Sequence, residues 1–176
     1  MSNVLTFSRT TGSSERPTMN HELKSSLFTP DKTINVTGKI TSIVYNFIFK
    51  YAGNSNPSWT GYASIVASDG TEYKGISLTK TITKNTNISM SLTIPEANCP
   101  PASVINSNNF KIKLTTTACS KDPYVPASSA MSIVVTYGGA QPYVYNGTKW
   151  VPATPYVYNG STWVQASASI YNNGWI

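Results

Sequence analysis

The stretch TSIVYNFIFKY, residues 41–51, decides the fold class of this chain. Its large apolar side chains fall at every second position, on Ile43, Tyr45, Phe47, Phe49 and Tyr51. Successive side chains of a β-strand point to opposite faces, whereas an amphipathic helix repeats every 3.6 residues. The stretch therefore predicts a β-strand whose aromatic face lies in a protein core.

The same alternation recurs further along the chain. It is found in ISMSLTIP (88–95), FKIKLTT (110–116) and MSIVVTYG (131–138), and Asp69-Gly70 lies between two strand-like runs. Asp-Gly flanked by strand formers is a strong hairpin signal. About seven short strands with turns between them predict an antiparallel β-sandwich of immunoglobulin-like or jelly-roll type. Alternation alone does not distinguish these two types.

The composition divides the chain into three parts. Residues 1–30 are polar and rich in Ser and Thr, which predicts an extended N-terminal arm that docks on a neighbouring subunit. The predicted sandwich covers residues 31–138, and the Gly- and Pro-containing segment YGGAQP (137–142) ends it. Residues 141–176 form a third part, which is repetitive.

The repetitive part contains two copies of one aromatic phrase. PYVYNG at 142–147 recurs at 155–160, and Trp150-Val151 recurs as Trp163-Val164. Asn-Gly favours a two-residue type I′ turn, so we expect two β-hairpins with Asn146-Gly147 and Asn159-Gly160 at their turns. This register pairs Tyr143 with Trp150 and Tyr156 with Trp163. A shortened third copy contains Tyr171 and Trp175.

The predicted hairpins gather their aromatic rings on one face, which makes this face the candidate binding surface. One interpretation is a subunit interface or the core of a small repeat domain, since a single hairpin is marginal in water. The other is a stacking platform for glycans. The candidate residues are Tyr143, Tyr145, Trp150, Tyr156, Tyr158, Trp163, Tyr171 and Trp175.

These units resemble a known group of sequences. Tandem Y-x-Y-N-G-x-x-W units, here Tyr143 to Trp150 and Tyr156 to Trp163, are similar to the C-terminal tails of bacteriophage structural proteins. The resemblance implies a virion protein of the tail, baseplate, fibre or head-decoration type, assembled in the host cytoplasm and exposed on the particle surface. A weaker resemblance is to choline-binding repeats, which are longer and open with a Gly-Trp pair that these units lack.

The charge pattern argues against several classes of partner. Charged residues make up only 11 % of the chain, and the net charge of +6 is scattered without a basic cluster. Nucleic-acid binding is therefore not expected. The N-terminus lacks a secretory signal pattern and no apolar run is long enough for a membrane span, so we expect no membrane insertion.

Few residues are available for catalysis. His21 is the only histidine, which excludes histidine-based triads and most metal sites. The nearest carboxylate pair, Asp69 and Glu72, flanks a turn. Cys99 and Cys119 are either a disulfide or two thiols.

We therefore expect a non-enzymatic protein without cofactor or metal. Its expected partners are other virion proteins, further copies of itself in a homo-oligomer, and host-surface polysaccharide. The alternative is a stand-alone carbohydrate- or cell-wall-binding module.

Overall fold

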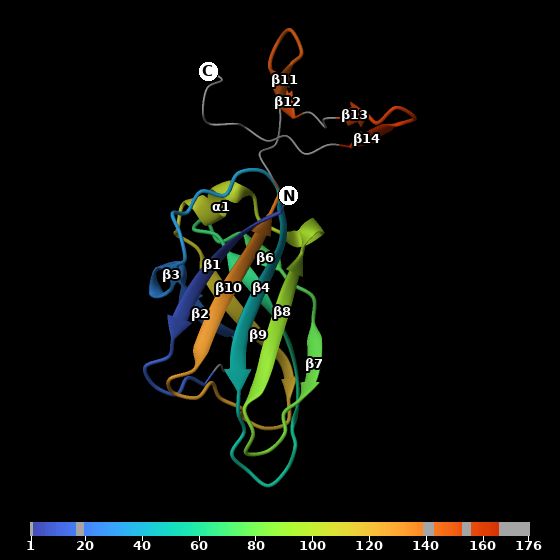
Figure 1. Cartoon of the computed structure of the whole chain (residues 1–176). Helices are drawn as coiled ribbons and strands as arrows, with labels where there is room; N and C mark the ends of the chain where they lie inside the picture. Colours follow the sequence, from blue (N-terminus) through green and yellow to red (C-terminus); the bar gives the residue numbers. More distant parts are fainter. Residues whose placement is uncertain (1, 17–19, 139–142, 153–155, 166–176) are drawn as a thin grey trace.

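A computed structural model describes residues 2–16, 20–138, 143–152 and 156–165. Two antiparallel sheets pack face to face as a β-sandwich (Figure 1). The sheet nearer the viewer, called the β4 sheet, has the order β3 (Thr29–Pro30), β1 (Asn3–Thr10), β10 (Ala130–Tyr137), β4 (Ile40–Phe49) and β8 (Ile88–Pro95). The predicted β-sandwich is confirmed.

The second sheet, called the β5 sheet, lies behind the first. Its order is β2 (Asn20–Lys24), β9 (Lys111–Cys119), β5 (Ser58–Val66) and β6 (Glu72–Lys74), with β7 (Leu78–Thr81) also paired to β5. Three short helical turns complete the sandwich: η1 (Ser25–Leu27), η2 (Glu96–Asn98) and α1 (Ala102–Asn106). The predicted hairpin at Asp69-Gly70 is confirmed, because it joins β5 to β6 and Gly70 has a φ of +88°.

The strand pairs are nested inside one another. β1 pairs with β10, β2 with β9, β4 with β8, and β5 with β6. Nested antiparallel pairs are what results when one long hairpin is rolled into a double-sheet jelly roll. The topology thus selects the jelly roll over the immunoglobulin-like alternative.

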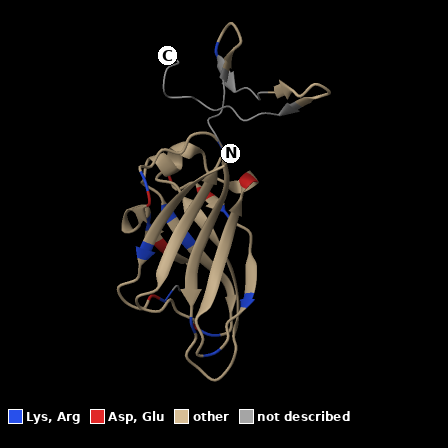
Figure 2. Ribbon diagram, viewed as in Figure 1, with Lys and Arg blue, Asp and Glu red and all other residues tan. Residues whose placement is uncertain are grey.

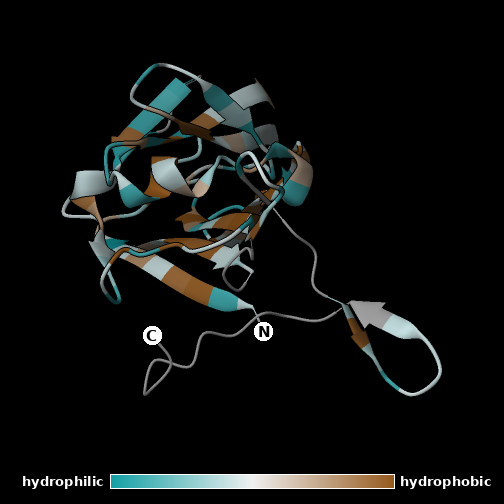
Figure 3. Cartoon of the chain, turned by 90° about the horizontal axis from the view of Figure 1, so that it is seen from above, coloured by the Kyte–Doolittle hydropathy of each residue, from teal (hydrophilic) through white to brown (hydrophobic). Residues whose placement is uncertain are grey.

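The aromatic face of β4 forms a column through the core. Tyr45 and Phe47 have ring centroids 5.0 Å apart, and Phe47 and Phe49 are 4.8 Å apart. Phe49 in turn contacts Trp59 of the opposite sheet. Figure 3 shows the underlying pattern, in which hydrophobic and hydrophilic residues alternate along the strands. The prediction that the aromatic face of 41–51 lies in the core is confirmed.

The predicted N-terminal arm over residues 1–30 is wrong. β1 pairs with β10 from Asn3 to Thr10, and Leu5 and Phe7 are buried in the core. β2 likewise pairs with β9 at one edge of the β5 sheet. The segment looked like an arm because only two large apolar residues of β1 face inward, while its Ser and Thr side chains cover the outward face.

The two C-terminal hairpins are present, but the predicted register is wrong. β11 (Tyr143–Tyr145) pairs with β12 (Trp150–Pro152), and β13 (Tyr156–Tyr158) pairs with β14 (Trp163–Gln165). Tyr145 lies opposite Trp150, and Tyr158 lies opposite Trp163. The turns are therefore centred one residue later than an Asn-Gly type I′ turn would place them.

Candidate functional site

The second hairpin exposes a pair of aromatic rings. The rings of Tyr158 and Trp163 have centroids 5.5 Å apart and planes inclined at 51°. The exposed fractions are 53 % for Tyr158 and 69 % for Trp163, and Tyr156 and Val157 are also more than half exposed. Apolar side chains that are exposed together in one patch indicate a surface for contact with a partner or ligand.

The turn of this hairpin explains the observed register. The Asn159 side-chain Oδ1 accepts hydrogen bonds from the backbone N–H groups of Ser161 (3.0 Å) and Thr162 (2.9 Å). The Asn159 N–H donates to the Thr162 carbonyl at 3.1 Å. Gly160 has a φ of +95°, a conformation that favours glycine. The asparagine thus stands beside the turn and caps it, while Gly160 and Ser161 occupy its centre.

The first hairpin repeats this construction. Asn146 Oδ1 accepts from the N–H groups of Thr148 and Lys149, both at 3.0 Å, and Gly147 has a φ of +93°. The backbone register places Tyr145 opposite Trp150 and Tyr143 opposite Pro152. The structure therefore brings the predicted residues together within each hairpin, whereas Tyr171 and Trp175 lie outside the described residues.

The outward face of the β4 sheet, called the β4 face, is a second candidate that we did not predict from the sequence. Its side chains come from alternate positions of five strands, and among the described residues none is charged or aromatic. Figure 2 shows the contrast, with β10, β4 and β8 tan along their lengths. The face consists of Val4, Thr6, Ser8, Thr10, Thr29, Ser42, Val44, Asn46, Ile48, Ser89, Ser91, Thr93, Ala130, Ser132, Val134 and Thr136.

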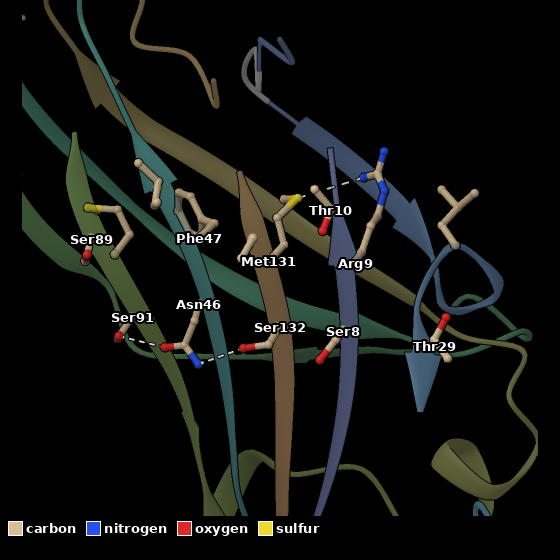
Figure 4. Close-up of a pocket in the computed structure, with 14 residues that line it drawn as sticks. Ser8, Arg9, Thr10, Thr29, Asn46, Phe47, Ser89, Ser91, Met131 and Ser132 are labelled. Atoms are coloured by element: carbon tan, nitrogen blue, oxygen red, sulfur yellow. Dashed lines mark hydrogen bonds between the residues drawn. The ribbon is translucent and has the colours of Figure 1, made fainter. Parts of the chain in front are cut away.

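One polar row crosses all five strands of this face. The strand registers align Thr29, Ser8, Ser132, Asn46 and Ser91. The Ser91 hydroxyl donates to Asn46 Oδ1 at 2.7 Å, and Asn46 Nδ2 donates to the Ser132 hydroxyl at 3.2 Å (Figure 4). Three side chains of this row, Ser91, Asn46 and Ser132, therefore hold one another in position through their hydrogen bonds.

A shallow hollow of about 680 Å³ lies along this row. Leu27, which is 51 % exposed, forms part of its lining beside β3. Of the described residues that line the hollow, Arg9 alone is charged, and its guanidinium is already paired with Glu15. The hollow thus offers hydroxyl, amide and methyl groups to a partner.

The outward face of the β5 sheet, called the β5 face, is different because it carries charge. Lys111 lies 2.7 Å from Glu22, and Glu72 lies 3.3 Å from Lys113 and 3.9 Å from Lys74. Burial opposes ionisation of Glu72, but its hydrogen bonds to Ser64 and Lys113 outweigh that effect, so its pKa is lowered. The two outward faces of the sandwich therefore differ in their electrostatics.

His21 belongs to a polar group at the joint between the sheets. Its Nε2 lies 3.4 Å from Glu15 Oε2, and Glu15 is paired with Arg9. Burial, followed by the charge of Glu15, raises the pKa of the neighbouring Tyr45 phenol. The group ties β1, β2 and the intervening loop together.

The two cysteines are free thiols. Cys99 lies near one end of β4, where its thiol contacts the Ile94 carbonyl. Cys119 lies near the other end, because it is the register partner of Trp59, and Trp59 packs on Phe49. Ile43, opposite Ile94, and Phe49 are six positions apart, about 20 Å along a strand. A disulfide requires Cα atoms within about 7 Å. Burial raises the pKa of the Cys99 thiol to about 11.

The remaining acidic candidates have structural partners. Asp69 accepts a hydrogen bond from the Thr71 N–H at 2.8 Å within its turn, and Glu72 bonds Ser64. Within the described ranges, no three His, Cys, Asp or Glu side chains are grouped so that they could hold a metal ion. No helix of the described chain has the length and apolar content to cross a membrane.

A second hollow, of about 760 Å³, opens beside Trp59 at the ends of β5 and β9. Trp59 itself is 1 % exposed, and its indole N–H donates to the Thr116 hydroxyl at 3.0 Å. The ring is therefore a core residue and does not offer its face to a ligand.

Comparisons with known proteins give distant similarities of fold. No protein-family model and no curated protein matches the chain. A carbohydrate-binding module from a glycoside hydrolase family 9 protein of Ruminococcus flavefaciens is 15 % identical, with 75 % of this chain and 97 % of that chain covered and a TM-score of 0.45. A structure of infectious bursal disease virus, strain Gx, is 16 % identical over 84 % of this chain and 33 % of that chain, with a TM-score of 0.35.

A third similar structure is an endo-xylanase of Clostridium thermocellum in complex with xylohexaose. It is 13 % identical over 78 % of this chain and 30 % of that chain, with a TM-score of 0.33. The chain thus spans about a third of the length of the viral and xylanase chains. At these identities the likeness concerns the β-sandwich alone.

Proposed function

We propose that this chain is a non-enzymatic structural protein of a bacteriophage particle. In this proposal the jelly roll is the body that attaches to the particle, and the aromatic hairpins are binding elements that contact host-surface glycans. The observation that carries the proposal is the exposed Tyr158–Trp163 pair, built on a turn that the first hairpin repeats. The similarity of these units to the C-terminal tails of bacteriophage structural proteins supports an assignment to a phage particle.

The geometry of the ring pair suits a sugar ligand. The two planes are inclined at 51°, so they form an open angle with apolar faces and not a closed stack. Flat rings beside polar groups match pyranose rings, which have apolar C–H faces and polar edges. The exposed hydroxyl residues Ser161 and Thr162 follow in the same turn.

Repetition increases the strength of such a contact. A single hairpin offers little area, but two linked units that engage one polymer turn the second contact into an intramolecular step. Two copies with the same cap and the same register are therefore favoured on a protein that adheres to a polysaccharide.

The test is binding of the full chain to arrayed bacterial cell-wall polysaccharides. We expect Trp163→Ala and Tyr158→Ala to weaken binding at least tenfold, because each removes one wall of the ring pair. Ile76→Ala, which alters an exposed apolar residue outside both the hairpins and the β4 face, is the matched control and should bind like the parent. Absence of binding to any polysaccharide, or binding that survives both hairpin substitutions, would contradict the glycan role.

The particle setting needs a separate measurement. Mass spectrometry of gradient-purified phage particles should detect the chain in stoichiometric amounts with the other structural proteins.

A stand-alone carbohydrate- or cell-wall-binding module is the second candidate function. The same exposed ring pair favours it. It predicts glycan binding by a chain that is absent from purified particles, so the two measurements together distinguish the candidates.

A further inference from the structure

We infer that the β4 face is the surface through which two copies of this chain pack against each other. The inference deepens the proposed function, on which it rests for its setting, because it names the contact that would join copies on a particle. The face is wide and formed by the long strands β1, β10, β4 and β8.

Electrostatics favours the β4 face over the β5 face as the contact between two copies. Each copy carries a net charge of +6, so two copies repel each other, and the repulsion is smaller when the lysines lie away from the contact. The β5 face carries Lys74, Lys111 and Lys113, whereas no described side chain of the β4 face is charged. Apposing two β4 faces therefore leaves these lysines in water, and the charged groups that border the face are already satisfied, Arg9 by Glu15 and Asp31 by the Thr6 N–H.

The arrangement of side chains on the face has the anatomy of an interface. One row across the strands, Thr6, Val134, Val44 and Thr93, has an apolar centre and hydroxyl ends. The neighbouring polar row through Ser132 and Asn46 flanks that centre. Specific interfaces typically combine an apolar centre with a polar rim in this way.

If a two-fold axis passes near Val134 and Val44, these two valines of one copy pack against the same two valines of the other copy. Such an isologous contact requires a self-complementary surface. Hydroxyl and amide groups meet this requirement because each can both donate and accept hydrogen bonds. The bonds from Ser91 to Asn46 and from Asn46 to Ser132 also hold the rim in place before association, which reduces the entropy cost of binding.

The size of the face fits a dimer. β1 and β10 have eight residues each, which gives a length of roughly 27 Å, and four strands give a width of roughly 19 Å. The product is roughly 500 Å² for each partner, so two faces bury roughly 1,000 Å² in total, which is the lower end of the range for specific interfaces. Val4 and Leu27, exposed by 42 % and 51 %, lie at the margins and would gain burial.

A glycan is a less suitable occupant of this face. The apolar C–H face of a sugar ring packs well on a flat aromatic ring. No described residue of the β4 face is aromatic, while the hairpins expose several rings.

The test is sedimentation velocity of the full chain over a concentration series. We expect a dimer whose dissociation constant rises at least tenfold in both Val134→Lys and Ser8→Lys. Val134→Lys brings two lysines together at the axis, and Ser8→Lys places an unpaired charge within the contact. Thr115→Lys, which adds the same charge to the β5 face, is the matched control and should remain dimeric. Circular dichroism shows whether each variant folds. If Val134→Lys does not fold, Ser8→Lys still tests the inference, because Ser8 is exposed on β1.

A monomeric parent at all concentrations would overturn the inference, and so would folded variants that dimerise like the parent. A dimer that Trp163→Ala dissociates while Ser8→Lys leaves it intact would also overturn it, because the hairpins would then be the contact. Glycan binding is measured separately, so failure of the dimer and failure of the proposed function give different results.

Discussion

The ring of Phe49 meets the indole of Trp59 edge to face, with centroids 5.4 Å apart and planes at 73°. Phe49 belongs to the β4 sheet and Trp59 to the β5 sheet, so this contact joins the two layers of the sandwich. Edge-to-face pairs contribute about 0.5–1.5 kcal/mol beyond the burial of their area. Trp59 is also bonded to Thr116, which makes it the most consequential single side chain of the core.

Replacement of Trp59 should reduce the free energy of unfolding strongly. We expect Trp59→Ala to cost about 3–5 kcal/mol, because it leaves a large cavity against Phe49 and removes the partner of Thr116. Urea denaturation followed by far-ultraviolet circular dichroism measures this change. Trp163→Ala, which alters an exposed ring, should leave the main transition within about 0.5 kcal/mol of the parent.

Gly61 permits the position of Trp59. A Cβ atom on Gly61 would overlap the Trp59 ring and the Thr115 carbonyl, both of which are fixed by packing. Gly61→Ala should therefore destabilise the fold by about 1–3 kcal/mol or more in the same denaturation experiment. Gly12→Ala is the control, since no atom lies within 4 Å of a Cβ there. Equal stability of both variants would show that the Trp59 ring can move aside.

The asparagine caps should determine the register of the hairpins. Asn159→Ala removes the acceptor of two backbone hydrogen bonds, so we expect fewer cross-strand nuclear Overhauser effects between the backbones of Tyr158 and Trp163. Asn159→Asp keeps an oxygen at the same position and should retain them. Unchanged cross-strand signals in Asn159→Ala would mean that Gly160 alone sets the turn.

Glu72 should make stability depend on pH. Because its pKa is lower in the folded chain than in the unfolded one, its contribution is fully present above the unfolded value and is lost as the pH falls through the folded value. We expect the parent to lose more stability than Glu72→Gln between pH 6 and about pH 3. Parallel curves for the two proteins would indicate that Lys113 and Ser64 give Glu72 no net stabilisation.

Much of the sandwich could be predicted because it follows from local alternation. The inward face of β4 can be identified from the sequence, since its buried residues are the alternate apolar positions Ile43, Tyr45, Phe47 and Phe49. β1 was missed because only Leu5 and Phe7 face the core, and its place depends on pairing with β10, more than a hundred residues away.

The hairpins show a different limit of sequence reasoning. Asn-Gly indicates a tight turn, but the side chain of the asparagine can cap the turn instead of entering it, and this choice shifts the register. The sequence predicts the aromatic rings on one face of each hairpin, but in the observed register Tyr158, and not Tyr156, lies opposite Trp163.

The β4 face could not be predicted without knowledge of the strand order. A signal was present, because the outward positions of 88–95 and 131–138 are all uncharged, whereas those of 110–116 include Lys111 and Lys113. Only the topology shows that the uncharged strands are neighbours in one sheet and the lysine-bearing strand lies in the other.

The nested strand pairs also determine when the fold can form during synthesis. The innermost pair, β5 with β6, is complete early, but β1 has to wait for β10, whose last residue is Tyr137. Until then the growing chain exposes the inner faces of β1 and β4 to solvent, and unpaired strands are prone to aggregate. Pairings so distant in sequence also slow folding. The hairpins β11–β12 and β13–β14 follow β10 in the sequence, so they are synthesised after the strand that closes the jelly roll.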